Sequence, residues 1–152
     1  MNKNVTIVGA GLVGSLLSIY LAKRGYKINM YERRPDMRKA KISAGKSINL
    51  ALSDRGWRGL EGVGIADEIR KIAIPMYGRQ IHNRDGSTAF QPYGKKEQAI
   101  YSVSRAEINM KLMDLAEQQK DVKIHFDERC THVDRKNLNT HFENNTTKKI
   151  SF

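Results

Sequence analysis

Apolar residues follow two different spacings in the first part of the chain. A short apolar run over residues 4–8 leads into a glycine-rich turn, after which apolar residues recur every three or four positions. Gly25 interrupts that helical pattern, and a second apolar run ends in an acidic residue. Strand, helix and strand in this order are typical of a βαβ unit with parallel strands. The pattern predicts strands over 4–8 and 27–32, and a helix over 15–24 with Gly25 as its left-handed cap.

The rest of the chain mixes both spacings. Ser104 and Glu107 form a capping box that predicts a helix through residue 119. The turn signal Asp85-Gly86 predicts a hairpin. Two more helices are expected, one from Ser53 or Asp54 to about Leu60 and one over 65–72. Residues 47–52 form a short apolar-rich stretch. Strands are expected over 78–81, 88–90, 99–103 and 122–126, with weaker hairpins over 129–152.

Each glycine of the first turn has a physical task. Gly9 allows the tight turn, Gly11 lets the backbone approach a pyrophosphate, and Gly14 lets the helix pack closely on the sheet. The helix N-terminus offers N–H groups to phosphates, and Glu32, 18 residues after Gly14, can accept hydrogen bonds from a ribose. The turn and its context predict a site for an adenine dinucleotide. The alternative is a glycine-rich turn in an ordinary α/β crossover.

Composition narrows the class of protein. The chain has 152 residues, the usual length of one domain, and no apolar run approaches the roughly 20 residues that span a bilayer. We therefore expect no membrane segment in this chain. The N-terminus has no secretory signal pattern, and Cys130 is the one cysteine, which suits a reducing compartment. A cytoplasmic location is the expectation.

The net charge of +11 raises the question of nucleic acid. Residues 33–46 hold six of the 27 basic side chains, but neither a recognition helix nor a sheet of stacking aromatics accompanies them. We expect a solvated basic surface and no nucleic-acid partner. The histidines lack metal-ligand spacing, so we also expect no metal site; they are His82, His125, His132 and His141.

The segment after Glu32 separates two classes of dinucleotide-binding enzyme. An NAD-linked dehydrogenase would continue with repeated βα units, whereas a basic loop and an antiparallel insertion are typical of flavoprotein hydroxylases. The expected fold class is α/β, a Rossmann-like FAD-binding sheet with an inserted antiparallel β layer. The expected parts are a βαβ unit with the basic loop (1–53), the inserted strands (73–103) and a return helix and strands (104–152).

Six segments carry a resemblance to a known family: Gly9–Gly14, Tyr31–Pro35, Gly45–Ser53, Ile74–Met76, Gln91–Gly94 and Ser102–Arg105. In this order and spacing the chain resembles the kynurenine 3-monooxygenases, which are FAD-dependent aromatic hydroxylases. The most diagnostic string is Ser-Ile-Asn-Leu-Ala-Leu-Ser over 47–53; before it, Gly45-Lys46 replaces the usual Gly-Arg. The family continues with a second FAD motif and the rest of the substrate pocket, so the resemblance implies an N-terminal portion, a truncated FAD-binding domain.

The resemblance also implies roles for individual residues. Arg79 and Tyr93 match the pair that holds the carboxylate of L-kynurenine, and the alternative is a strand-surface arginine with a half-buried tyrosine. For the cofactor contacts, the alternatives are solvent-facing arginines, core packing at Ala51 and a small buried hydrophobe at Cys130. The implied FAD contacts are Gly9, Gly11, Val13, Gly14, Tyr31, Glu32, Arg33, Arg34, Ala51, Arg105 and Cys130.

The implied reaction is hydroxylation of L-kynurenine to 3-hydroxykynurenine with NADPH and O2. The flavin carries this chemistry, so no side chain is expected to act as a catalytic acid, base or nucleophile. Three alternatives stay open: an inactive or weakly FAD-binding fragment, a different aromatic-ring hydroxylase, and an NAD-linked dehydrogenase. The sequence does not determine the oligomeric state.

Overall fold

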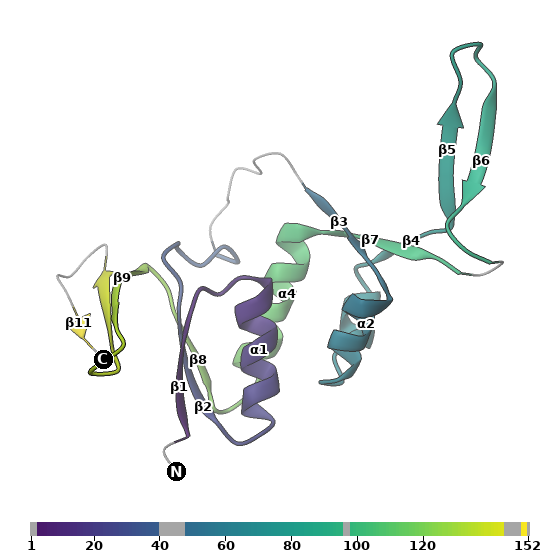
Figure 1. Cartoon of the computed structure of the whole chain (residues 1–152). Helices are drawn as coiled ribbons and strands as arrows, with labels where there is room; N and C mark the ends of the chain where they lie inside the picture. The colour runs from purple at the N-terminus through teal and green to yellow at the C-terminus, as the bar shows by residue number, and fades with distance from the viewer. Residues whose placement is uncertain (1–2, 40–47, 96–97, 145–149, 152) are drawn as a thin grey trace. The chain divides into compact units, whose positions relative to one another are not determined.

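The first apolar pattern predicts two strands of a parallel sheet and the helix between them, and the structure contains all three. A computed structural model describes residues 3–39, 48–95, 98–144 and 150–151 of the chain (Figure 1). The predicted basic loop beyond residue 39, Gly45-Lys46 and the first residue of the diagnostic string, Ser47, lie outside these residues. The chain forms two units, residues 1–45 with 109–152 and residues 46–108, and each is described by itself.

The first unit is built on a parallel sheet with strand order β1-β2-β8. Its strands are β1 (Asn4–Val8), β2 (Lys27–Tyr31) and β8 (Val122–His125), and Val5, Ile28 and Val122 lie side by side across it. Helix α1 (Leu12–Ala22) crosses from β1 to β2, as Figure 1 shows. The βαβ prediction is therefore confirmed.

Helix α1 begins at Leu12, three residues before the predicted range of 15–24. Gly11 is its N-cap, and the Ser15 N–H donates to the Gly11 carbonyl oxygen at 2.9 Å. Gly14 consequently belongs to the first turn of the helix rather than to the loop before it. Gly25 has φ +79°, so the left-handed cap is confirmed.

The core of the first unit forms where α1, the parallel sheet and the second half of α4 (Arg105–Glu117) contribute apolar side chains. Each strand of the sheet contributes at least one buried apolar side chain to this core. The buried residues include Ile7, Ile19, Ile28, Met30, Leu112, Met113, Leu115, Ala116 and Val122.

A small antiparallel sheet completes the first unit. It consists of β9 (Glu128–Asp134), β10 (Asn139–Asn144) and β11 (Ile150–Ser151), in the order β11-β10-β9. These strands confirm the weak hairpins expected over 129–152. Phe142 of β10 is fully buried and stacks on Tyr31 of β2 with ring centroids 4.1 Å apart, so β10 contributes directly to the core around the end of β2.

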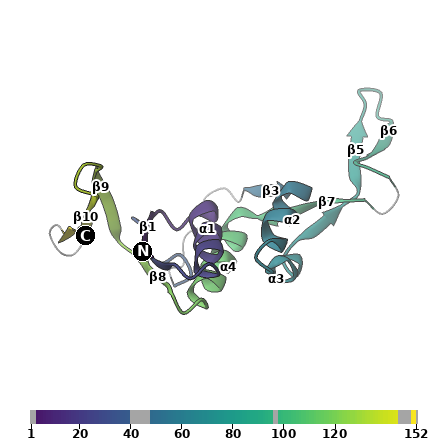
Figure 2. The same cartoon turned by 60° about the horizontal axis from the view of Figure 1, so that its bottom comes forward.

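The second unit holds a three-stranded antiparallel sheet with order β3-β7-β4. The strands are β3 (Asn49–Leu52), β4 (Ile74–Met76) and β7 (Ile100–Ser104). Helices α2 (Asp54–Glu61) and α3 (Ala66–Arg70) pack beside it, as seen in Figure 2, and bury Trp57, Leu60 and Ile69. Ser53 occupies the N-cap of α2 but makes no side-chain capping hydrogen bond.

The predicted hairpin is also present in the second unit. Strands β5 (Gly78–His82) and β6 (Thr88–Pro92) pair with each other as a two-stranded ribbon. The turn forms as predicted, because Asp85 Oδ1 accepts hydrogen bonds from the Ser87 N–H and hydroxyl, and Gly86 has φ +84°. Among the described residues, no helix combines the length and apolar composition needed to cross a bilayer.

Candidate functional site

The glycine turn presents an open backbone surface. Gly9 has φ +99°, and no protein atom lies within 4 Å of the position that a Cβ would take at Gly9 or Gly11. Gly14 is different, because a Cβ there would collide with the Gly9 carbonyl oxygen and lie 3.3 Å from Ile7 Cγ2. Gly14 therefore serves packing, whereas Gly9 and Gly11 leave room for a ligand at the N-terminus of α1. The exposed Val13 follows on the first turn.

Glu32 ties this turn to the segment that follows β2. Its side chain is buried; Oε2 accepts from the Ala10 N–H at 3.0 Å, and Oε1 accepts from the backbone N–H and Nε of Arg34 at 3.1 and 2.8 Å. Burial by itself raises the pKa of Glu32, but these hydrogen bonds and the charge of Arg34 outweigh it and hold the pKa below its usual value. The residue is thus a carboxylate, and after these three hydrogen bonds about one lone pair is left for a hydroxyl donor.

The neighbouring predicted residues differ in exposure. The Arg34 side chain is 59% exposed although it bonds Glu32, and Arg33 is exposed. Tyr31 is buried, with its ring stacked between His125 at 4.7 Å and Phe142 at 4.1 Å. Burial, together with the charge of Glu128, raises the pKa of the Tyr31 hydroxyl. Tyr31 therefore supports the end of β2 from inside.

Glu128 is a buried acidic group that sequence reasoning missed. Its backbone N–H donates to the Glu32 carbonyl oxygen at 2.9 Å, and its Oε1 accepts from Asn144 Nδ2 at 2.6 Å. Its Oε2 is buried and has no hydrogen-bond partner among the described residues. Cys130, two residues further along β9, is half-buried and lies opposite Phe142. No local spacing singles out Glu128, because its burial depends on β10.

Most of the predicted cofactor residues lie in the first unit, whereas Ala51, Arg105 and the predicted substrate pair lie in the second. Ala51 is exposed on β3, opposite Ser102 of β7. Arg105 opens α4, and its backbone N–H donates to the Ile48 carbonyl oxygen at 2.9 Å while its side chain is exposed.

Arg79 and Tyr93 lie on one face of the β5–β6 hairpin. Arg79 pairs with Gln91, and the Tyr93 N–H donates to the Tyr77 carbonyl oxygen at 2.9 Å, so the ladder extends one step beyond Pro92. Side chains two residues apart on a strand share a face. Arg79 and Tyr93 are then diagonal neighbours, a relation that places Cα atoms about 7–8 Å apart.

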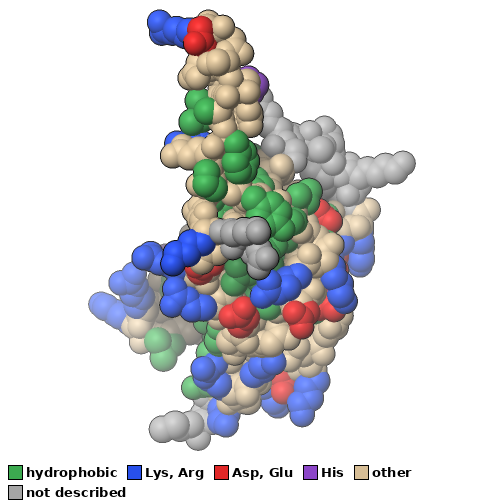
Figure 3. Space-filling model, turned by 90° about the vertical axis from the view of Figure 1, so that its right-hand side faces the viewer, with side chains coloured by type: hydrophobic (Ala, Val, Ile, Leu, Met, Phe, Trp, Pro, Cys, Tyr) green, Lys and Arg blue, Asp and Glu red, His purple; other side chains and the backbone are tan. Residues whose placement is uncertain are grey.

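The hairpin and strand β4 before it carry exposed apolar side chains. Tyr77 shares the face of Arg79 and Tyr93, whereas Phe90 lies on the opposite face. Ile74, Tyr77, Phe90 and Tyr93 are between 45% and 67% exposed, and Figure 3 shows hydrophobic side chains over this part of the second unit. An amino-acid substrate with an aromatic ring suits such a surface, because its carboxylate requires a guanidinium and its ring requires apolar contact.

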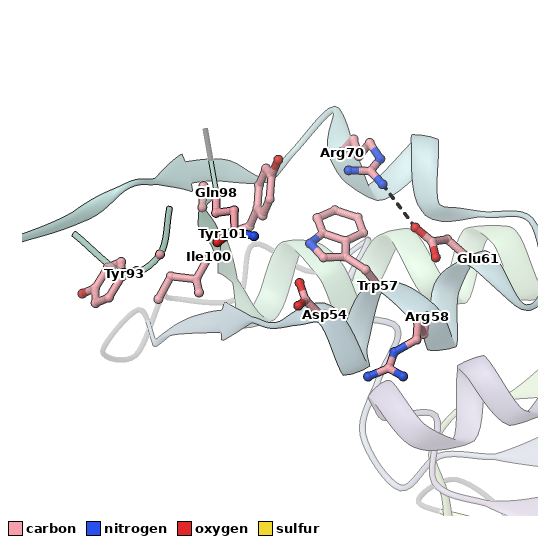
Figure 4. Close-up of a pocket in the computed structure, with 11 residues that line it drawn as sticks. Asp54, Trp57, Arg58, Glu61, Arg70, Tyr93, Gln98, Ile100 and Tyr101 are labelled. Carbon is pink, nitrogen blue, oxygen red and sulfur yellow. Dashed lines mark hydrogen bonds and ion pairs between the residues drawn. The ribbon is translucent and has the colours of Figure 1, made fainter. Parts of the chain in front are cut away.

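A cavity of about 580 Å³ lies next to the base of the hairpin in the second unit. Trp57 forms one wall; Arg70 stacks over its ring at 4.4 Å and is paired with Glu61 at 3.3 Å, as Figure 4 shows. Tyr93 and Tyr101 also line the cavity, and Tyr101 meets Trp57 edge-on. Sequence reasoning assigned Trp57 no role, since helical spacing alone marks it as a core residue.

An ionic cluster around Arg38 anchors the segment after Glu32, and it too was missed. Arg38 Nε and Nη2 donate to the two carboxylate oxygens of Asp36 at 2.8 and 2.9 Å. Its Nη1 donates to Asp114 and Glu117 of α4 at 2.9 and 2.6 Å. These bonds raise the pKa of Arg38, and the Arg38 hydrogen bond lowers the pKa of the buried Asp36. The sequence shows the Asp36-x-Arg38 spacing, but it does not show that Arg38 also bonds Asp114 and Glu117 of α4.

Substitution of Arg38 tests whether its ionic cluster anchors the segment after Glu32. We expect Arg38→Ala to lower the free energy of unfolding by about 2 kcal/mol, because Asp36 would stay buried without its cation. Urea unfolding followed by circular dichroism measures the change. Arg129→Ala, which removes an exposed arginine of β9, is the matched control and should shift stability by less than about 0.5 kcal/mol. Equal effects of the two substitutions would contradict an anchoring role.

The comparisons with known proteins agree with this geometry. A family model described as "FAD binding domain" matches residues 2–151. The chain is 49% identical over 134 residues to a kynurenine 3-monooxygenase of Christiangramia forsetii, covering 88% of this chain and 30% of the relative. It is 53% identical over 131 residues to a kynurenine 3-monooxygenase of Myxococcus xanthus, covering 86% and 28%. The chain thus spans less than a third of the length of these relatives, and the resemblance seen in the motifs is confirmed.

Solved structures agree on the fold. The p-nitrophenol 4-monooxygenase PnpA from Pseudomonas putida matches with a TM-score of 0.77 at 15% identity, covering 97% of this chain and 38% of PnpA. The flavin-dependent monooxygenase PieE, solved with FAD and substrate, matches with a TM-score of 0.76 at 15% identity, covering 97% and 28%. The expected fold class, a flavoprotein hydroxylase sheet with an antiparallel layer, is confirmed.

Proposed function

This chain belongs to the FAD binding domain family, and from that membership we propose that it binds FAD and serves the hydroxylation of L-kynurenine to 3-hydroxykynurenine with NADPH and O2. The observation that carries the proposal is the 49–53% identity to two kynurenine 3-monooxygenases over most of the chain. A small-molecule substrate and a cytoplasmic location belong to the same proposal, and the single cysteine of the sequence supports the latter.

The glycine turn is the proposed pyrophosphate site. Gly9 and Gly11 leave open space beside the N-terminus of α1, where unpaired N–H groups favour an anion, and the first-turn residue Val13 borders that space. Glu32 is held as a carboxylate and accepts from a ribose hydroxyl, with Arg33 and Arg34 beside the adenosine. Bound FAD supplies the redox and oxygen chemistry.

The remaining cofactor residues have narrower proposed roles. The exposed guanidinium of Arg105 suits pyrophosphate or ribitol oxygens, and the small side chain of Ala51 allows close approach of the backbone. Cys130 is proposed to meet the adenine through its backbone. Tyr31 is proposed to act indirectly, because both of its ring faces are covered by His125 and Phe142.

Substrate orientation is assigned to the hairpin. The Arg79 guanidinium binds the carboxylate of L-kynurenine, and the Tyr93 hydroxyl donates a further hydrogen bond to it. Their shared face supports this role, since one anion can meet both side chains. The exposed Tyr77 on the same face would offer apolar contact to the aromatic ring of the substrate.

A chimeric enzyme tests this function on the residues of this chain. In the Myxococcus xanthus relative, the segment that matches this chain is replaced by the chain itself, so that the relative supplies the remaining length. We expect the chimera to purify with FAD, to oxidise NADPH faster when L-kynurenine is added, and to release 3-hydroxykynurenine. A chimera that holds FAD but ignores L-kynurenine would favour a different aromatic hydroxylase, and a colourless protein that turns over NADH would favour a dehydrogenase.

Arg79→Met in the chimera addresses the substrate site. We expect it to raise KM for L-kynurenine about tenfold while FAD content stays constant, because a charge-assisted hydrogen-bonded pair is lost. Arg84→Met, at the exposed tip of the same hairpin, removes the same charge away from Tyr93 and is the control. Steady-state kinetics give KM for L-kynurenine in both variants. Equal KM values for the two would overturn the assignment of Arg79 to the substrate carboxylate.

A further inference from the structure

One face of the β5–β6 hairpin carries a second polar side chain directly beside Arg79. Gln91 is its register partner across the ladder, and Arg79 Nε donates to Gln91 Oε1 at 2.8 Å. The guanidinium has only donors, so the oxygen of the Gln91 amide must face it. Tyr77 and Tyr93 continue the same face at the base of the hairpin, because the ladder extends to them.

This hydrogen bond changes what Arg79 can offer to an anion. A guanidinium can receive a carboxylate in two bidentate ways, through Nε and one Nη, or through Nη1 and Nη2. The first way is blocked while Nε donates to Gln91. The second edge, formed by Nη1 and Nη2, is left for the carboxylate, and it lies at the end of the side chain farthest from the strand.

Gln91 also limits the freedom of a long side chain. Arg79 is exposed on its strand, and an exposed arginine loses rotamer entropy when it is fixed. A neighbour that holds Nε beforehand reduces the part of this cost that falls on binding. Orientation of the guanidinium is thereby set before a substrate arrives.

We propose that Gln91 is a positioning residue that holds the Nε edge of Arg79 and so restricts substrate carboxylates to the Nη1–Nη2 edge. This inference rests on the proposed function, since it requires that Arg79 binds a carboxylate. Gln91 acts through Arg79 and therefore contributes to the preference for substrates that carry a carboxylate. It contributes nothing to the binding of an analogue that lacks the carboxylate.

The test compares L-kynurenine with kynuramine, the analogue without the carboxylate, in the chimeric enzyme. Gln91→Leu removes the acceptor, and we expect KM and the dissociation constant for L-kynurenine to rise about fivefold, the cost of one hydrogen bond. We expect kcat, FAD content and KM for kynuramine to stay unchanged. Titration calorimetry of L-kynurenine binding gives a readout that is independent of turnover.

Two further variants separate positioning from mere support of the hairpin. Gln91→Glu keeps an acceptor for Nε but adds a negative charge, so we expect KM for L-kynurenine to rise more than in Gln91→Leu while kynuramine is unaffected. Gln80→Leu makes the same chemical change on the opposite face of the hairpin and should leave both substrates unchanged.

The outcomes distinguish the inference from the function on which it rests. A wild-type chimera that does not hydroxylate L-kynurenine overturns both. An active wild-type chimera in which Gln91→Leu changes neither substrate, or changes both equally, overturns the positioning role alone. A Gln91→Glu variant that weakens kynuramine as much as L-kynurenine would likewise overturn the positioning role.

Discussion

Gly14→Ala is expected to abolish FAD binding and to lower the free energy of unfolding by about 3 kcal/mol. A Cβ at this position would collide with the Gly9 carbonyl oxygen, a backbone atom that cannot rotate away, and would crowd Ile7. Helix α1 would have to move off β1, which disturbs the turn that faces the ligand. Urea unfolding and titration of FAD fluorescence with the purified chain measure the two effects.

Gly11→Ala is the matched control for this prediction. The same methyl group at Gly11 meets no protein atom within 4 Å, so we expect the free energy of unfolding to change by less than about 1 kcal/mol. FAD binding should nevertheless weaken, because the new side chain occupies the space proposed for the pyrophosphate. If both variants lost stability equally, the division between a packing glycine and ligand-facing glycines would be wrong.

Glu32→Ala is expected to destabilise the first unit by about 3 kcal/mol and to weaken FAD binding at the same time. The substitution leaves the Ala10 N–H without its acceptor and removes the partner of Arg34 beside it. Glu32→Gln should cost less, about 1–2 kcal/mol, because its one carbonyl oxygen can still accept from one of these donors. Chemical unfolding of the variants measures both values, and Glu143→Gln, an exposed change on β10, is the control.

The pH dependence of this contribution has a definite sign. The pKa of Glu32 is lower in the folded protein than in the unfolded chain, where it is about 4.3. The ionised group therefore stabilises the fold fully above that unfolded value, and the contribution is lost as the pH falls through the folded pKa. The stability difference between wild type and Glu32→Gln should be constant from about pH 6 upward and shrink below about pH 4. A difference that grew on acidification would contradict the assignment.

Much of the site was predictable because it depends on neighbours in sequence. Gly9, Gly11 and Gly14 follow a strand and open a helix, and this spacing implies both the turn and the phosphate-binding end of α1. The hairpin around Asp85 was predictable for the same reason, since its turn is closed by side-chain bonds within three residues.

Other features depended on residues far apart in the chain. Arg38 finds Asp114 and Glu117 more than 70 positions away, and the burial of Tyr31 depends on Phe142. Periodicity and turn signals report on local backbone preference, so they carry no information about such pairs. The resemblance to a family supplied residues such as Arg79, but it did not supply Gln91, whose role follows from its place in the ladder.

The sequence by itself determined the βαβ unit, the glycine turn and the hairpin, because each depends on the spacing of nearby residues. The class of cofactor followed from the segment after Glu32 and from the resemblance to a family. Only the tertiary structure decided which contacts the Glu32 carboxylate, directly after β2, makes with the rest of the protein. Glu32 lies 22 positions from Ala10, yet its carboxylate accepts the Ala10 N–H and is held ionised. That contact exists because parallel β1 and β2 bring their carboxyl ends to the same edge of the sheet, a consequence of chain packing that local spacing does not contain.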